Sequence, residues 1–249
     1  MIIDTHVHLN DLKLYENLVE IIKEANNNMV EKMIVVGYDK ESSLIAIDIA
    51  SRYEGIYCAI GIHPSEVKDL NDDLKWIEEE LSNPKVIAIG ETGLDYYWDK
   101  SFKEKQQEYF IKQLVIANKH NLPVIIHSRS ATNETYEILK TSNVKGVMHC
   151  YSGSLEMALK FIDIGFLLGI GGVVTFKNAG LVDVVRDIDL KYLLSETDAP
   201  YLAPTPYRGK TNYPKYTKIV VEEIAKIKNM SFENVMIKLE ENTYNLFNI

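Results

Sequence analysis

Eight short apolar runs alternate along this chain with segments of helical periodicity, and this alternation limits the folds open to it. The runs are rich in Ile, Val, Leu, Gly and Ala. They read as continuous segments, which is typical of strands buried on both faces. They span residues 2–4, 33–37, 56–61, 86–90, 123–127, 146–149, 166–170 and 192–196. Because each gap can hold one helix and two short loops, the order predicts a parallel sheet.

Apolar residues at helical spacing fill the gaps and continue beyond the last run. The expected helices lie at residues 14–22, 44–49, 74–81, 102–120, 134–140, 154–163, 178–187, 214–228 and 231–247. We expect Asn71, Ser154 and Ser231 to cap helix N-termini, because short polar side chains accept hydrogen bonds from the first free amides of a helix.

Eight strand–helix units in 249 residues favour a closed (β/α)8 barrel, an α/β fold of the TIM-barrel type, over an open doubly wound sheet. The open sheet usually carries a glycine-rich phosphate-binding turn after its first strand. Here the first strand runs into Asp4-Thr-His-Val-His8 instead. The 46% hydrophobic content suffices for one large core, and no linker interrupts the chain. We therefore expect residues 1–249 to form a single domain.

Metal-type ligands stand at the ends of five predicted strands. His6 and His8 follow the first, where residues two apart in an extended chain point to the same side. The other candidates at strand ends are Glu91, His127, His149 and Asp198. Barrel active sites form at this end of the strands. With His63 after strand three, five of the six histidines are expected at one rim, which favours a metal site over unrelated structural histidines.

Six imidazole and carboxylate ligands are too many for one tetrahedral ion with an open position, so they predict two divalent ions. A ligand set without thiolates suits Zn²⁺, Mg²⁺, Mn²⁺, Ni²⁺, Co²⁺ or Fe²⁺. We expect Glu91 to bridge the ions, and Asp198 to ligate one ion and take the proton of the attacking water. Glu196 fits direct ligation and a hydrogen bond to another ligand equally well.

Basic and aromatic residues gather in the loops beside these strand ends. Arg129 is two residues beyond a candidate ligand, and Arg208 lies in the loop after strand eight. Both are expected to bind substrate phosphate. Lys215 is interpreted as ordinary surface charge. The aromatic residues 96–98 fit two interpretations equally well, stacking on nucleobases or packing within their loop.

Composition limits the kinds of ligand and the cellular location that we expect. The net charge of −9 argues against sequence-blind binding of nucleic acid through a basic face, although bound divalent cations would reverse the sign locally. Cys58 and Cys150 form no disulfide framework. Cys58 is expected in the core, and Cys150, if the strand continues past His149, should point away from the metal ligands and pack in the fold. The chain shows neither a signal peptide nor about 18 consecutive apolar residues. We expect a cytoplasmic protein without membrane contact, with a monomer favoured.

Taken together, the motifs closely resemble those of the TatD family of metal-dependent deoxyribonucleases, within the amidohydrolase superfamily. The matching stretches are Ile3–Asn10, Gly61–Pro64, Ile89–Tyr96, Pro123–Arg129, His149–Gly153, Glu196–Leu202 and the late residues Arg208, Gly209, Lys210, Asn212 and Pro214. They follow the family's order along most of the chain. One departure is Asn133, where members usually carry an acidic residue.

The resemblance implies an ester-bond hydrolase that cleaves DNA phosphodiesters with a metal-bound hydroxide, often from the 3′ end of single strands. The implied ligand sets are His6, His8 and Asp198 for one ion, His127 and His149 for the other, and Glu91 for both. His63 is implied to contact substrate phosphate. The alternative is a deacylase or lactonase, because the same centre attacks carbonyl carbon. A scaffold with a vestigial site is a third reading, disfavoured because no predicted ligand is missing.

Overall fold

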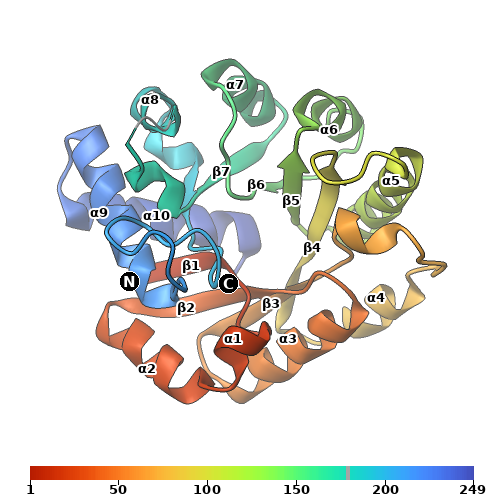
Figure 1. The fold of residues 1–249 in the computed structure, drawn as a ribbon, viewed down its shortest axis with the longest axis horizontal. Coiled ribbons are helices and arrows are strands. Elements are labelled where there is room, and N and C mark those ends of the chain that lie inside the picture. The colour runs from red at the N-terminus through yellow and green to blue at the C-terminus, as the bar shows by residue number, and fades with distance from the viewer. Residues whose placement is uncertain (178–179) are drawn as a thin grey trace.

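All eight predicted strands are present, and they pair in parallel in one sheet. The computed structural model describes residues 1–177 and 180–249. The strands follow one another in chain order, as Figure 1 shows. Their bounds are β1 (Ile2–Val7), β2 (Val30–Val36), β3 (Ile56–Ile60), β4 (Val86–Asp95), β5 (Val124–Arg129), β6 (Gly146–Met148), β7 (Phe166–Ile170) and β8 (Leu193–Ser195).

Hydrogen bonds between β1 and the segment after β8 close the sheet into a barrel. Val7 forms a parallel bridge with Ala199. The His8 amide donates to the Ala199 carbonyl at 2.8 Å, and the Asp198 amide donates to the His6 carbonyl at 2.9 Å. The predicted (β/α)8 fold is therefore confirmed. The closure also places Asp198 directly beside His6, which lies within β1, and His8, which follows it.

Helices surround the sheet (Figure 1). Their bounds are α1 (Leu12–Tyr15), α2 (Leu18–Asn27), α3 (Lys40–Arg52), α4 (Lys75–Glu80), α5 (Lys103–His120), α6 (Thr132–Leu139), α7 (Leu155–Asp163), α8 (Leu181–Asp187), α9 (Thr217–Lys228) and α10 (Phe232–Phe247). Four 3₁₀ turns are η1 (Pro64–Val67), η2 (Gly172–Thr175), η3 (Leu190–Tyr192) and η4 (Pro214–Tyr216). Within the described residues, no helix is both long and apolar enough to cross a membrane.

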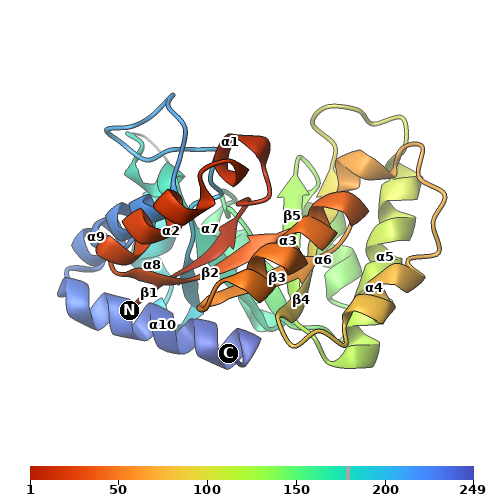
Figure 2. The same ribbon diagram turned by 90° about the horizontal axis from the view of Figure 1, so that it is seen from below.

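Side chains fill the interior of the barrel. Alternate residues of a strand point to opposite faces, so Ile34 and Val36 of β2 join one core cluster while Met33 and Val35 join another. The first cluster also takes in buried residues of β3, β4, β5, β6 and β8, together with Phe247 of α10. In Figure 2, α10 crosses the end of the barrel opposite α1. The barrel is therefore a packed core whose chemistry is confined to its rim.

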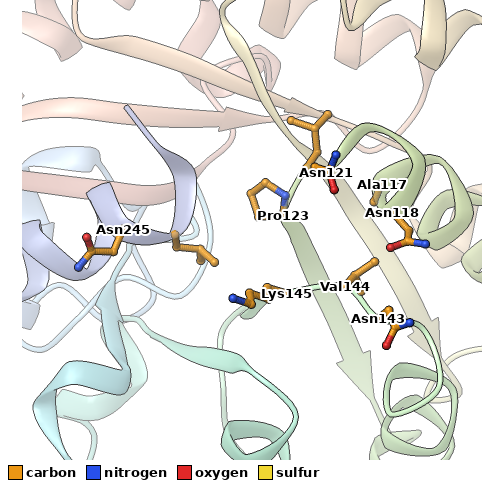
Figure 3. Close-up of a pocket in the computed structure, with 10 residues that line it drawn as sticks. Ala117, Asn118, Asn121, Pro123, Asn143, Val144, Lys145 and Asn245 are labelled. Carbon is orange, nitrogen blue, oxygen red and sulfur yellow. The ribbon is translucent and has the colours of Figure 1, made fainter.

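A cavity of 240 Å³ lies at the N-terminal end of the strands (Figure 3). It is lined in part by Pro123 and Lys145, which directly precede β5 and β6, and by Asn245 of α10. Because catalytic residues of such barrels come from the C-terminal ends of strands, this cavity belongs to the structural end of the molecule.

Two of the three predicted helix caps are confirmed. The hydroxyls of Ser154 and Ser231 each accept a hydrogen bond, 3.2 Å long, from the amide three residues further on. The prediction for Asn71 is wrong, because α4 begins only after Leu74, whose φ of 62° lies in the left-handed region. The carboxylate of Asp72 binds the Leu74 amide at 2.6 Å and so holds a turn before the helix starts.

Element ends differ from the prediction where the chain becomes polar. β4 continues past Gly90 to Asp95, so Glu91 and Asp95 both lie within one strand. The helix expected over 14–22 is two helices, α1 and α2. Of the helix expected over 178–187, residues 178 and 179 lie outside the described residues, and α8 begins at Leu181.

Replacing Leu168 with alanine is expected to lower the free energy of unfolding by about 2–5 kcal/mol, because this β7 side chain is fully buried in the core. Leu159→Ala on α7 is the matched control: Leu159 is 49% exposed, and its loss should change stability by no more than about 0.5 kcal/mol. Chemical denaturation measures both. Equal losses would contradict the burial described for the two leucines.

Candidate metal centre

Nitrogen and oxygen atoms from several strands meet at the C-terminal end of the barrel. His6 Nε2 lies 3.2 Å from His8 Nε2 and 3.4 Å from Glu91 Oε2. Asp198 Oδ1 lies 3.4 Å from His8 Nε2 and 3.8 Å from His149 Nε2. Ligand atoms held tetrahedrally at about 2.0–2.1 Å from an ion are about 3.3 Å apart. The observed separations therefore fit atoms that share a metal ion.

The two oxygens of Glu91 face different imidazoles. Oε2 is the oxygen next to His6, whereas Oε1 lies 2.9 Å from His127 Nδ1 and 3.8 Å from His149 Nε2. His63 Nε2 is also 3.8 Å from Oε1. A carboxylate with a separate set of ligands at each oxygen is arranged to bridge two ions. This geometry fits the bridging position predicted for Glu91.

The ligand atoms fall into overlapping groups. Each group has its nitrogen, oxygen or sulfur atoms within 4.8 Å of one another. The groups are His6, His8 and Asp198; His63, Glu91 and His127; His149, Cys150 and Asp198; and His6, His149 and Glu196. The first is the set predicted for one ion. The second brings His63, predicted to contact substrate, as close to Glu91 as a ligand would be.

Hydrogen bonds outside the cluster fix which nitrogen of each ring faces it. His8 Nδ1 lies 2.9 Å from the Val36 carbonyl, which can only accept, so Nδ1 carries the proton and Nε2 offers its lone pair. His127 Nε2 lies 3.0 Å from Asp95 Oδ2. A proton on that nitrogen leaves the Nδ1 lone pair directed at the Glu91 side. Both rings are thus prepared for metal binding before any ion arrives.

Glu196 lies on the outer side of His149. Its Oε1 accepts a hydrogen bond from the Cys150 amide at 2.6 Å and is 3.0 Å from His149 Nδ1. That nitrogen lacks an aligned hydrogen bond among the described residues, as does Glu196 Oε2. Since His149 Nε2 is the atom that faces Glu91 and Asp198, the position of Glu196 favours orientation of His149 over direct ligation.

Cys150 does not follow the expectation that it packs away from the ligands. Its Sγ lies within 4.8 Å of ligand atoms of His149 and Asp198. The expectation assumed that the strand continues, but β6 ends at Met148 and Cys150 has a φ of 45°. The turn removes the strand alternation that would have directed the thiol elsewhere. Cys58, by contrast, is buried in the core as expected.

The pKa values of the buried groups show that the carboxylates of the cluster are stabilised by positive charge on their neighbours. Burial alone would lower the pKa of His149, but Glu196, Glu91 and Asp198 outweigh it and raise that pKa to about 10. Burial alone would raise the pKa of Glu91, yet His149 and the other imidazoles hold it well below its usual value. Protons on the imidazoles therefore balance the carboxylates where no metal ion does so.

An open cavity of 400 Å³ lies above the cluster. The residues that line it are His8, Tyr38, His63, Ser65, Glu66, Glu91, His127, His149, Asp198 and Tyr201. Of the three residues predicted to bind substrate, only His63 is among them. Arg129 lines a neighbouring cavity of 140 Å³ together with His149. Arg208 lies with its guanidinium carbon 4.5 Å from the centre of the Phe176 ring.

Two further basic and aromatic residues have structural contacts. Lys215 forms an ion pair of 2.7 Å with Glu24, in agreement with its interpretation as surface charge. Tyr201 lines the cavity, and its hydroxyl donates to Asp11 at 2.9 Å.

Tyr38 also lines this cavity. The sequence did not mark it as a candidate, because tyrosine is not one of the metal-ligand residue types on which the prediction relied.

Asp95 is a candidate site residue to which the sequence analysis assigned no role. One carboxylate oxygen contacts His127, and the other accepts the Tyr97 amide at 2.9 Å. A spacing of four residues from Glu91 would have suggested a shared face, because residues i, i+2 and i+4 of a strand point the same way. That signal was hidden because the apolar run ends at Gly90.

Asp95→Asn is expected to weaken divalent metal binding about 10- to 100-fold. Asparagine Oδ1 can still accept the Tyr97 amide, but its amide nitrogen would face His127 Nε2 and move the ring proton to Nδ1. Calorimetric titration with Zn²⁺ or Mn²⁺ measures the change, and circular dichroism checks the fold. Asp163→Asn, an exposed site on α7, is the control. Unchanged affinity in the Asp95 variant would show that the contact does not orient the ring.

Comparison with known proteins agrees with this site. The family described as TatD related DNase matches residues 3–248. The chain is 45% identical to an uncharacterized metal-dependent hydrolase, YabD, of Bacillus subtilis, over all of both chains. It is 36% identical to YcfH of Escherichia coli, another uncharacterized metal-dependent hydrolase, over all of this chain and 96% of the relative.

A solved structure agrees over the whole chain. The TatD homologue YjjV from Escherichia coli superposes with a TM-score of 0.96 at 31% identity, covering 100% of this chain and 98% of that one. Fold, ligand-type residues and sequence similarity thus point the same way, and the chain belongs to the TatD related DNase family of metal-dependent hydrolases.

Proposed function

We propose that this protein is a divalent-metal-dependent deoxyribonuclease that hydrolyses DNA phosphodiester bonds, acting on single strands from the 3′ end. The observation that carries the proposal is Glu91, whose two oxygens each face a separate set of imidazoles beneath an open cavity. The family's description as DNase supports DNA as the substrate. A phosphodiester is also the substrate that most needs such a site, because its negative charge must be neutralised before a nucleophile can attack.

Different residues of the chain would hold the metal ions and transfer the proton. Two divalent ions, when bound, would neutralise the phosphate and make water a better nucleophile. Glu91 would bind both ions, since one of its oxygens faces His6 and the other faces His127. Asp198, beside His8 and open to the cavity, would take the proton from the attacking water.

His63 is suited to hold a phosphate oxygen. Its Nδ1 accepts the Ser65 amide at 3.1 Å, so a neutral ring carries its proton on Nε2, the nitrogen nearer the cluster. Burial and the neighbouring His127 lower the pKa of His63 to about 3, which keeps the ring neutral at physiological pH. A neutral N–H donor can bind a phosphate oxygen without repelling the metal ions.

Metal removal and restoration test the activity directly. Purified protein supplied with Mn²⁺, Mg²⁺ or Zn²⁺ should degrade end-labelled single-stranded DNA, EDTA should stop the reaction, and added metal should restore it. Strands labelled at the 5′ end should yield a ladder that shortens stepwise, because removal begins at the 3′ end. A parallel panel of lactone and acylated amine substrates covers the carbonyl alternative. Hydrolysis of that panel with DNA left intact would overturn the proposal.

Asp198→Asn is expected to reduce the turnover number on DNA by at least about 100-fold, because the amide can neither accept the proton nor supply the negative charge. The fold should remain, since the hydrogen bond from the Asp198 amide to the His6 carbonyl involves only backbone. Asp163→Asn serves as the matched acidic control. Turnover near the wild-type value in the Asp198 variant would remove this residue from the reaction.

A further inference from the structure

Two large aromatic side chains stand in solvent beside the metal centre. Tyr97 is 54% exposed and Trp98 is 77% exposed, in the loop after β4. Their rings meet edge to face, with centroids 4.8 Å apart and planes at 88°. Burying an aromatic side chain normally stabilises a fold. Leaving two neighbouring rings exposed gives up that gain, and contiguous exposed apolar surface of this kind marks binding sites.

Arg129 completes the cluster. Its guanidinium carbon lies 3.8 Å from the centre of the Tyr97 ring and 5.4 Å from that of Trp98. Across residues 1–177 and 180–249, its side chain has neither a hydrogen bond nor an ion pair. The aromatic ring therefore holds the guanidinium in place by a cation–π contact, and the N–H donors stay available for an anion.

The cluster is fixed to the metal centre through the backbone. The Tyr96 amide donates to the Arg129 carbonyl at 2.9 Å, which ties the loop to the end of β5. Asp95 accepts the Tyr97 amide with one oxygen and contacts His127 with the other. Arg129 also lines a cavity in common with His149. A ligand on the exposed rings would therefore lie next to whatever occupies the metal centre.

We propose that Tyr97, Trp98 and Arg129 form a binding site for one unpaired nucleobase and its adjoining phosphate, next to the phosphate that is cleaved. The inference rests on the proposed nuclease function and names how that substrate is held. Exposed rings stack on any base, and a guanidinium binds phosphate oxygens. A base inside a duplex is stacked between its own neighbours, so the site selects single strands.

Tryptophan fluorescence reports on this site alone. The chain has two tryptophans, and Trp76 is only 5% exposed, so a ligand that stacks on the surface can reach only Trp98. Metal-loaded protein should lose fluorescence on titration with a phosphorothioate-linked oligothymidylate, whose linkages resist hydrolysis. An abasic phosphorothioate strand of equal length offers the same phosphates without bases and should leave the fluorescence unchanged.

Variants separate stacking from charge. The double variant Tyr97→Ala/Trp98→Ala should bind the oligothymidylate about tenfold more weakly, the loss expected from one base–aromatic stack, and should bind intact and abasic strands equally. Trp98→Phe keeps a ring and should retain the preference for the intact strand. Val115→Ala, which removes a side chain 61% exposed on α5, is the matched surface control. Fluorescence anisotropy of end-labelled strands measures the affinities.

The outcomes distinguish this inference from the proposed nuclease activity. If the protein degrades DNA but neither quenching nor a preference for intact strands is seen, the base site is wrong and the nuclease proposal stands. If the phosphorothioate strand quenches Trp98 but unmodified single-stranded DNA is never hydrolysed with any of the metals, base binding stands and the nuclease proposal fails. Equal quenching by the abasic strand would also overturn the base site, because it would assign the signal to phosphate.

Discussion

The Glu91 carboxylate, buried at the mouth of the barrel, is the group around which the functional end of this protein is organised. A buried carboxylate is stable only where positive charge or hydrogen-bond donors surround it. Imidazoles on both sides supply this, with His6 next to one oxygen and His127 next to the other. Protons on those rings and metal ions are two ways to provide the same charge, so metal binding must displace protons. The arrangement that satisfies the carboxylate is therefore also the one that holds cations.

Closure of the barrel brings Asp198 next to the histidines around Glu91. β1 and the segment after β8 are far apart in the chain, yet Asp4 accepts hydrogen bonds from both the amide and the hydroxyl of Thr197, at 2.9 and 2.5 Å. These bonds act one residue from Asp198 and hold it beside His8. The carboxylate of Asp4 is fully buried, and burial raises its pKa to about 7 against the hydrogen bonds from Thr197, which lower it. The hydrogen bonds that close the barrel between β1 and the segment after β8 therefore also hold Asp198 in the candidate metal centre.

The fold could be predicted where burial leaves a local pattern in the sequence, and could not where polar groups find hydrogen-bond partners far away along the chain. The eight apolar runs are readable because both faces of each strand are covered. The prediction ended β4 too early, because its polar continuation finds partners on elements distant in the sequence, α5 among them: Gln113 donates to the Thr92 hydroxyl at 2.7 Å, and Gln106 accepts the Asp95 amide at 2.9 Å. The residues next to Asp95 in the sequence do not indicate that these glutamines will be its neighbours in the fold. The turn at Cys150 was missed for a related reason, since a positive φ at a cysteine has no sequence mark.

The net charge of −9 restricts how such a protein can hold DNA. A broad basic face would bind the DNA backbone strongly, and that binding would weaken steeply as the salt concentration rises. If DNA is the substrate, as proposed, an acidic chain would depend more on contacts to the bases, which respond less to salt than contacts to phosphates do. Asp95 joins the two functions, because a single carboxylate orients His127 and anchors the loop that carries the exposed rings. In the proposed base site, a displacement of that loop would also change the Asp95 contact to His127, so nucleobase binding and metal binding would be physically coupled.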